Sequence, residues 1–243
     1  YNIAIEYFEK ALAIVKKHYG EYHPSIAICY NNLGAAQQSK GEYEKAIENY
    51  EKALTIDKKL YGEYHPSIAI CYNNLGAAKQ SKGEYGKAIE YYEKAMVIDK
   101  KLYGEEHPDI AASYNNIGSA LYSKGEYGKA IEYYEKALAI DKIFYGEEHL
   151  SIARNYNNIG QALSNKGEFN KAIEYFEKAL VIFIKFNEED PHIAICYNNI
   201  GTAWLRKGEY DKAIEYIEKA LTIDKKYNGE KHPSFATRYN NIG

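Results

Sequence analysis

Cysteine is scarce in this chain, and so are methionine and tryptophan. The 243 residues include three cysteines, one methionine and one tryptophan. The cysteines, Cys29, Cys71 and Cys196, are odd in number and far apart, so they do not form a disulfide framework, and free thiols are typical of a reducing compartment. We therefore expect small, buried or half-buried side chains at these positions, and a cytoplasmic location.

Long apolar runs and an excess of positive charge are also absent. No run of 18 or more apolar residues occurs, and no charged stretch followed by an apolar segment opens the chain, so neither a membrane span nor a signal peptide is expected. Lysine and arginine total 31 against 34 aspartates and glutamates, which gives a net charge of -3. Since a phosphate backbone requires a basic surface, the composition predicts no nucleic-acid partner and no membrane partner.

The sequence does contain a repeat. The motif Y-N-N-[LI]-G occurs six times, at residues 30–34, 72–76, 114–118, 156–160, 197–201 and 239–243. The intervals are 42, 42, 42, 41 and 42 residues, so one structural unit is copied in tandem. The expected boundaries are a partial unit at 1–19, five units at 20–61, 62–103, 104–145, 146–186 and 187–228, and a partial unit at 229–243.

Each unit predicts two helices. In the second unit, Pro66 suits the first position of a helix, with His65 at or beside the cap, and apolar or small residues then follow at helical spacing up to Gly83. A second amphipathic helix runs from Glu84 to about Tyr103. Such a thin pair of antiparallel helices cannot bury its own apolar faces, so the pairs are expected to stack as a solenoid.

A glycine recurs inside the first helix of each unit, at Gly34 and Gly76 in the first two units. Glycine costs about 1 kcal/mol relative to alanine in a helix interior, so its recurrence indicates that the second helix approaches closely there. In the fourth unit, N-E-E-D-P replaces the usual turn G-E-E-H-P, and we expect Asn187 to adopt the left-handed conformation of the glycine it replaces.

The repeated pattern resembles the tetratricopeptide repeat (TPR). Residues that match the signature of that family in type and spacing are Tyr30, Leu33, Gly34, Tyr43, Ala46, Tyr50 and Ala53. The resemblance covers the whole chain, although the unit has 42 residues rather than the usual 34, and units of this length with H-P before the first helix are most similar to those of kinesin light chains. It implies an all-α, right-handed α-solenoid that is not an enzyme, needs no cofactor and binds a protein or peptide in a concave groove.

The resemblance places the first asparagine of each Y-N-N motif on that groove. These residues are Asn31, Asn73, Asn115, Asn157, Asn198 and Asn240. An amide both donates and accepts hydrogen bonds, so a ladder of amides can pair with the backbone of an extended peptide. The alternative is that these asparagines bond between neighbouring helices and stabilise the stack. Residues beside the ladder vary at Tyr122, Arg154 and Gln161, so any selectivity is expected in the third to fifth units.

The histidines also recur with the repeat, at His23, His65, His107, His149 and His232. Successive copies lie a whole unit apart and do not converge as metal ligands must, so we expect them to cap helices, as Asp190 would in the fifth position. The alternative is that Asp57 and His65 form a catalytic dyad. It is weakened because Phe183 stands at the position of the aspartate in the fourth unit, and no serine or cysteine nucleophile recurs nearby.

Three functions fit this sequence. The first is a peptide-binding scaffold, which the asparagine ladder favours. The second is a structural array that associates end to end, because the half units at 1–19 and 229–243 lack the polar capping repeats that usually finish a solenoid. The third is the sensor arm of a larger signalling ATPase or other enzyme.

Overall fold

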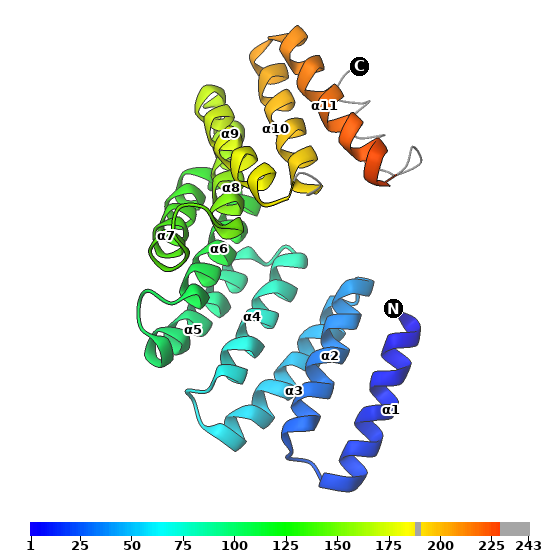
Figure 1. Cartoon of the computed structure of the whole chain (residues 1–243). Helices are drawn as coiled ribbons and strands as arrows, with labels where there is room; N and C mark the ends of the chain where they lie inside the picture. Colours follow the sequence, from blue (N-terminus) through cyan, green and yellow to red (C-terminus); the bar gives the residue numbers. More distant parts are fainter. Residues whose placement is uncertain (188–190, 229–243) are drawn as a thin grey trace. The chain divides into compact units, whose positions relative to one another are not determined.

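The computed structural model describes residues 1–187 and 191–228, and within these ranges it contains eleven helices and no strand (Figure 1). The chain divides into two compact units, Tyr1–Lys124 and Gly125–Gly243. Consecutive helices within each unit are joined by short turns and pack against each other. The structure therefore confirms the all-α class and the stacking of antiparallel helix pairs.

The first compact unit holds six helices. They are α1 (Asn2–Tyr19), α2 (Pro24–Lys40), α3 (Tyr43–Tyr61), α4 (Pro66–Ser81), α5 (Tyr85–Tyr103) and α6 (Pro108–Ser123). Helix α2 packs on α1 and α3 and also touches α4, so the first helices of successive repeats lie against each other. The predicted starts and ends of the helices in the second repeat agree with α4 and α5 to within two residues.

The second compact unit holds the remaining described helices. They are α7 (Tyr127–Tyr145), α8 (Leu150–Lys166), α9 (Phe169–Phe186), α10 (Pro191–Lys207) and α11 (Tyr210–Asn228). Each packs on the next, and α8 also contacts α10. In the described part of the chain, no helix is both long and apolar enough to cross a membrane.

Histidine caps begin the even-numbered helices from α2 to α8. Nδ1 of His65 accepts a hydrogen bond from the backbone N–H of Ser67 at 3.3 Å, and the same bond forms at His23, His107 and His149. This arrangement satisfies one of the free N–H groups at each helix start. The predicted capping role is confirmed at these four positions, whereas Asp190 and His232 lie outside the described residues.

The turn before each capped helix is built in the same way. Before α4, the ring of Tyr61 stacks on His65 with centroids 3.9 Å apart, and Nζ of Lys58 lies 2.8 Å from a carboxylate oxygen of Glu63. Gly62 between them has φ 78° and ψ -162°, a region that essentially only glycine reaches. The turns before α2, α6 and α8 repeat the stack, the ion pair and the glycine.

The conformation expected of Asn187 is wrong. This residue has φ -163° and ψ 112°, which is extended backbone, and its N–H still closes α9 on the carbonyl of Phe183. The glycines at the equivalent turns have ψ near 180° rather than the left-handed helical value, and a residue with a Cβ does not reach that region. Asparagine therefore leaves the helix by a different path.

The interior glycines of α2, α4 and α8 each mark a close approach of the second helix, as predicted. A Cβ on Gly34 would lie 2.7 Å from Cε1 of Tyr50, and one on Gly76 would lie 2.6 Å from Cε1 of Tyr92. In the second compact unit, Gly160 lies against Phe176 in the same way. In these three pairs, the second helix thus packs directly on the backbone of the first.

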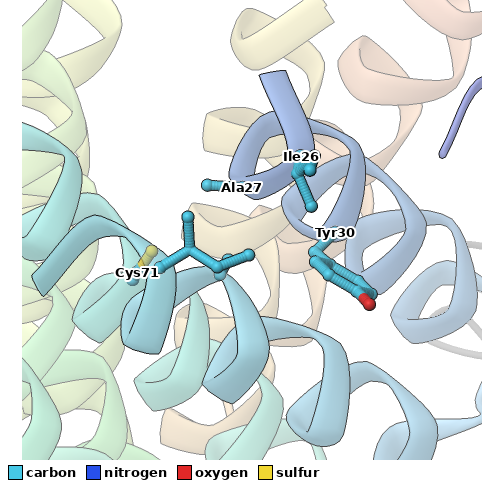
Figure 2. Close-up of a cluster of buried hydrophobic side chains, with 6 residues drawn as sticks. Ile26, Ala27, Tyr30 and Cys71 are labelled. Atoms are coloured by element: carbon cyan, nitrogen blue, oxygen red, sulfur yellow. The ribbon is translucent and has the colours of Figure 1, made fainter. Parts of the chain in front are cut away.

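The core between repeats is apolar and includes cysteine. Ile26, Ala27 and Tyr30 of α2 form a buried cluster with Cys71 of α4 (Figure 2), and Ala53 and Ile56 of α3 complete it. Cys71 and Cys196 are buried and Cys29 is half-buried, and all three are free thiols. The predicted role of the cysteines as small packing residues is therefore confirmed.

Candidate functional site

In the first compact unit, an uncharged row of side chains runs along the first helix of each repeat. We call it the A stripe and define it in the first compact unit as Ile28, Asn31, Ala35 and Gln38 on α2, Ile70, Asn73, Ala77 and Gln80 on α4, and Ala112, Asn115, Ser119 and Tyr122 on α6. The spacing i, i+3, i+7, i+10 places the members of each helix on one face. Ile28 and Ile70 are 58% and 55% exposed. The stripe thus presents aliphatic surface beside amides.

The asparagines of the stripe contact neighbouring helices. Oδ1 of Asn31 accepts a hydrogen bond from Nδ2 of Asn74 on α4 at 3.3 Å, and Nδ2 of Asn31 donates to Sγ of Cys71 at 3.5 Å. In the second compact unit, Oδ1 of Asn157 accepts a 3.0 Å bond from Nδ2 of Asn199. In these two cases, the first asparagine of one repeat is therefore hydrogen-bonded to the second asparagine of the next. This is the alternative stated in the sequence analysis, in which the asparagines stabilise the stack.

Two other stripe asparagines differ from Asn31. The Oδ1 atoms of Asn73 and Asn115 are buried and have no hydrogen-bond partner among the described residues. A buried amide oxygen without a donor costs about 1–3 kcal/mol, so these two positions do not contribute to the stack as Asn31 does. All of the stripe asparagines mentioned here are half-buried.

In each stripe glutamine of α2 and α4, both the nitrogen and the oxygen of the side-chain amide are hydrogen-bonded. Nε2 of Gln38 donates to Oγ of Ser81 on α4 at 3.3 Å, and its Oε1 accepts from the hydroxyl of Tyr50 on α3 at 3.1 Å. Gln80 repeats the tyrosine contact one unit later, accepting from the hydroxyl of Tyr92 at 3.0 Å, and its Nε2 donates at 3.0 Å to Ser119, a serine at a different position of α6. These bonds fix the amides against the neighbouring helices. The hydrogen bonds from the Tyr50 and Tyr92 hydroxyls to these glutamines were not predicted from the sequence.

The remaining predicted site residues are divided between the compact units. Tyr122 is half-buried on α6 in the first unit. In the second unit, Arg154 is exposed on α8, Gln161 is half-buried on the same helix, and Asn198 is half-buried on α10. Asn240 lies outside the described residues.

A second recurring feature is a buried aspartate in the second helix of several repeats. Asp57, Asp99 and Asp141 are all buried where α3, α5 and α7 meet the following capped helix. Burial raises the pKa of each carboxyl, and for Asp99, where the negative charge of Asp109 acts in the same direction, it reaches about 6. Burial also raises the pKa of Cys71 to about 12, so this thiol stays protonated and is no nucleophile at neutral pH.

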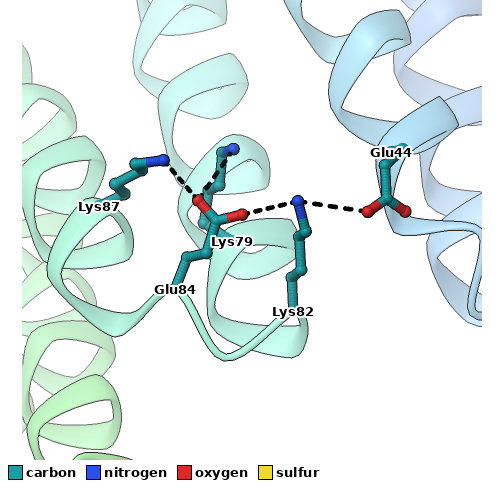
Figure 3. Close-up of polar contacts among 5 residues, drawn as sticks. All are labelled: Glu44, Lys79, Lys82, Glu84 and Lys87. Carbon is teal, nitrogen blue, oxygen red and sulfur yellow. Dashed lines mark hydrogen bonds and ion pairs between the residues drawn. The ribbon is translucent and has the colours of Figure 1, made fainter.

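Ion pairs gather at the turn between the two helices of a repeat. Glu84 accepts from Lys79, Lys82 and Lys87, and Lys82 also reaches Glu44 at the start of α3 (Figure 3). The lysines hold the pKa of Glu84 at about 2. These pairs lie at or near the surface and orient the turn, whereas a surface pair alone adds little stability. Over the described residues, no three histidine, cysteine, aspartate or glutamate side chains gather as metal ligands would.

Two equivalent cavities lie outside the A stripe and were not predicted. The first has a volume of about 420 Å³ and is lined by Tyr22, Tyr30, Glu48, Glu51, Lys52 and Ile56, among others. The second has about 430 Å³ and is lined by the residues 42 positions further on, Tyr64, Tyr72, Glu90, Glu93, Lys94 and Ile98. One sequence feature could have indicated these cavities. Tyr22 and Tyr64 occupy a position of the repeat at which the next two repeats have Glu106 and Glu148.

Comparison with known proteins identifies the repeat. A family model described as tetratricopeptide repeat matches residues 1–59, 38–101, 67–143, 109–185 and 151–226. Among curated proteins, no sequence matches this chain closely enough to count as a relative.

Several solved structures share the architecture. BtubC (BKLC) from P. vanneervenii is 24% identical with a TM-score of 0.79 over 96% of this chain and 93% of its own. A Podosopora anserina putative kinesin light chain with nearly identical TPR-like repeats is 26% identical, with a TM-score of 0.70 over 86% of this chain and 99% of its own. Aspartyl phosphate phosphatase F from Bacillus subtilis has a TM-score of 0.77 at 18% identity, over 90% of this chain and 56% of its own. Because the family model spans nearly all of the sequence, and kinesin-light-chain-like structures share its fold, the chain belongs to the tetratricopeptide repeat family.

Proposed function

We propose that this chain is a non-enzymatic scaffold that binds an extended peptide segment of a partner protein along the A stripe. TPR folds typically serve as protein-interaction scaffolds. The observation that carries the proposal is the exposure of Ile28 and Ile70 in a row without charged side chains, in a chain whose residues are 27% charged. Exposed aliphatic side chains at the same position of successive repeats favour a partner that buries them.

The amides beside these isoleucines supply polar contacts for a peptide backbone. Asn31 uses one N–H of its amide to contact Cys71, and Gln38 likewise donates to Ser81. Each amide nitrogen carries two N–H groups, so a second donor is left for a peptide carbonyl. Because the side chains are already fixed by neighbouring helices, little further side-chain entropy is lost on binding. In the first compact unit, Asn73, Asn115 and Tyr122 belong to this proposed surface. In the second unit, Asn157, Asn198, Arg154 and Gln161 are the corresponding proposed positions.

A binding screen tests the proposal. We would probe the purified chain with an array of ten-residue uncharged peptides that carry leucine or isoleucine, and then measure the best binder in solution. Ile70→Asp should abolish binding, because it places an unpaired charge in the apolar row. The matched control is Ile143→Asp, which changes a similarly exposed isoleucine on α7, outside the stripe. Equal loss in both variants, or no loss in either, would contradict the proposal.

End-to-end association is a second candidate, favoured by the exposed face of α1. Tyr7 and Ile14 of α1 are 66% and 68% exposed, whereas Asn49 and Ile56 at the equivalent positions of α3 are 7% and 6% exposed. A helix from a second copy would cover this face. Light scattering over a concentration series should show a rising mass that Ile14→Glu suppresses. A constant monomer mass at high concentration would reject this candidate.

The cytoplasm is the location we propose for both activities. Cys29, Cys71 and Cys196 are free thiols, and a reducing compartment keeps thiols in this state. Fractionation of cells that express the tagged full-length protein would check the location, and recovery from an oxidising compartment would contradict it.

A further inference from the structure

We infer that the two cavities along α3 and α5 form a second binding site, which takes arginine side chains from a basic segment of a partner protein. This site is separate from the A stripe, since no residue that lines either cavity belongs to the stripe. Its ligand class also differs, because the stripe is uncharged and the cavities carry carboxylates.

Each cavity combines aromatic rings with carboxylates. In the second one, Tyr64 comes from the turn before α4 and Tyr72 from α4 itself, while Glu90 and Glu93 come from α5. A planar guanidinium stacks on a tyrosine ring and pairs with a carboxylate through two parallel hydrogen bonds. The lining thus offers both kinds of contact that arginine recognition uses, in a volume of about 430 Å³.

The carboxylates are available to a ligand. Within the described residues, Glu48, Glu51, Glu90 and Glu93 are exposed and take part in no ion pair. The glutamate at the nearby turn behaves differently, because Glu84 is paired with three lysines. Two of the three carboxylates that line each cavity therefore have no ion-pair partner. Each lining also contains one lysine, Lys52 or Lys94, so three carboxylates against one ammonium leave a net negative charge, which favours a cationic ligand and disfavours an acidic one.

The tyrosines at the cavity rim already contact cations of this chain. Nζ of Lys59 lies 3.3 Å from the centroid of the Tyr22 ring, and Nζ of Lys101 lies 3.3 Å from that of Tyr64. These contacts show that the rings are placed where a positive charge can approach their faces. An incoming guanidinium competes with a flexible lysine for the ring, and it adds the carboxylate contact.

The duplication of the cavity sets the form of the partner. Equivalent lining residues are 42 positions apart, so the same pocket is offered twice within one compact unit. A segment that carries two arginines can occupy both pockets, and the second contact then benefits from a high effective concentration.

A titration with defined peptides tests the site. The probe is a fluorescently labelled Gly/Ser peptide that carries two arginines, and matched peptides carry two lysines or two glutamates. We expect binding in the order arginine, then lysine, with no binding of the glutamate peptide, and an affinity that falls as salt is added. Absence of arginine-peptide binding at millimolar concentration and low salt would overturn the proposal, as would equal binding of the glutamate peptide.

One substitution separates ring recognition from simple charge attraction. Tyr22→Glu combined with Tyr64→Glu makes the cavities more negative but removes the rim rings, and Glu106 and Glu148 show that glutamate is accepted at this position of the repeat. We expect affinity for the arginine peptide to fall by about tenfold. Unchanged or tighter binding would overturn the aromatic part of the site.

Two further variants complete this test. Tyr210→Glu changes an exposed tyrosine on α11 and should leave the affinity unchanged, which controls for the added charge. Glu90→Gln combined with Glu93→Gln should weaken binding and reduce its salt dependence. If the affinity and its salt dependence were both unchanged, the role of the carboxylates would be contradicted.

Discussion

The carboxylate of Asp141 accepts a 2.7 Å hydrogen bond from Nδ2 of Asn155, and both side chains are buried where α7 meets α8. The same position of the preceding repeats pairs Asp57 with Cys71, whose Sγ lies 3.6 Å from the carboxylate. At the joint between α5 and α6, the corresponding residue is Ser113, whose buried Oγ has no partner among the described residues. The residue that corresponds to Asn155 thus differs among these three repeats, while the buried aspartate is the same in each.

We predict that Asn155→Val destabilises the fold by about 1–3 kcal/mol at pH 7, because it leaves a buried carboxylate without its donor. Urea denaturation monitored by circular dichroism would measure this change. Burial raises the pKa of Asp141, and removal of the Asn155 donor raises it further, so the loss of stability should shrink as the pH falls and the carboxylate takes up a proton. A loss that stays constant between pH 4 and pH 7 would show that the hydrogen bond to the carboxylate is not its cause.

The pH dependence of stability should depend on Asp99. Its pKa rises from 3.8 to about 6 in the folded chain, so the folded state holds this proton more tightly than the unfolded state. A raised carboxyl pKa means that stability is highest below the unfolded pKa and declines as the pH rises through about 4 to 6. Asp99→Asn should therefore stabilise the chain by about 1–3 kcal/mol at pH 7 and flatten the profile in this window.

Asp141→Asn is the matched control for this substitution. The carboxylate of Asp141 already accepts a hydrogen bond from Asn155, so the exchange replaces a charged acceptor by a weaker neutral one and should give less stabilisation, or none. Denaturation at several pH values would distinguish the two. An Asp99→Asn profile as steep as that of the unchanged chain would contradict the assignment.

The glycine contacts give a prediction with an internal control. Gly76→Ala should destabilise by about 1–3 kcal/mol, because the new Cβ would meet the Tyr92 ring at 2.6 Å in a packed interface. Gly86→Ala, on α5, meets nothing within 4 Å and should stabilise by about 0.5–1 kcal/mol. Thermal unfolding of both variants would check the contrast, and a similar sign for the two would refute it.

The sequence alone could predict the helix pairs and their close contacts, because the period, the capping histidines and the interior glycines each have a local physical cause. Gly34 and His65 are examples that the structure confirms. The conformation of Asn187 could not be predicted in this way. Its residue type permits left-handed helical backbone, but the equivalent turns combine a positive φ with a ψ near 180°, and essentially only glycine reaches that combination.

The details of the candidate site were also beyond the sequence. The Y-N-N motif placed an amide near the proposed ligand surface, but it did not show that Asn31 bonds to Asn74 while Oδ1 of Asn73 has no partner among the described residues. Those differences depend on rotamers and on small shifts between helices. The Tyr22 and Tyr64 cavities arise from three separate segments each, so periodicity could indicate that they are equivalent but not that they are hollow.

Capping provides the last prediction, because Nδ1 of His65 is the acceptor for the Ser67 N–H at the start of α4. His65→Ala removes this acceptor and the stack on Tyr61, and should cost about 1–2 kcal/mol. His65→Asp restores an acceptor of good capping geometry without the ring, so it should recover most of the loss that comes from the cap. Thermal unfolding of both variants at pH 7 would separate the two contributions: if aspartate is no better than alanine, the aromatic stack rather than the cap fixes this turn.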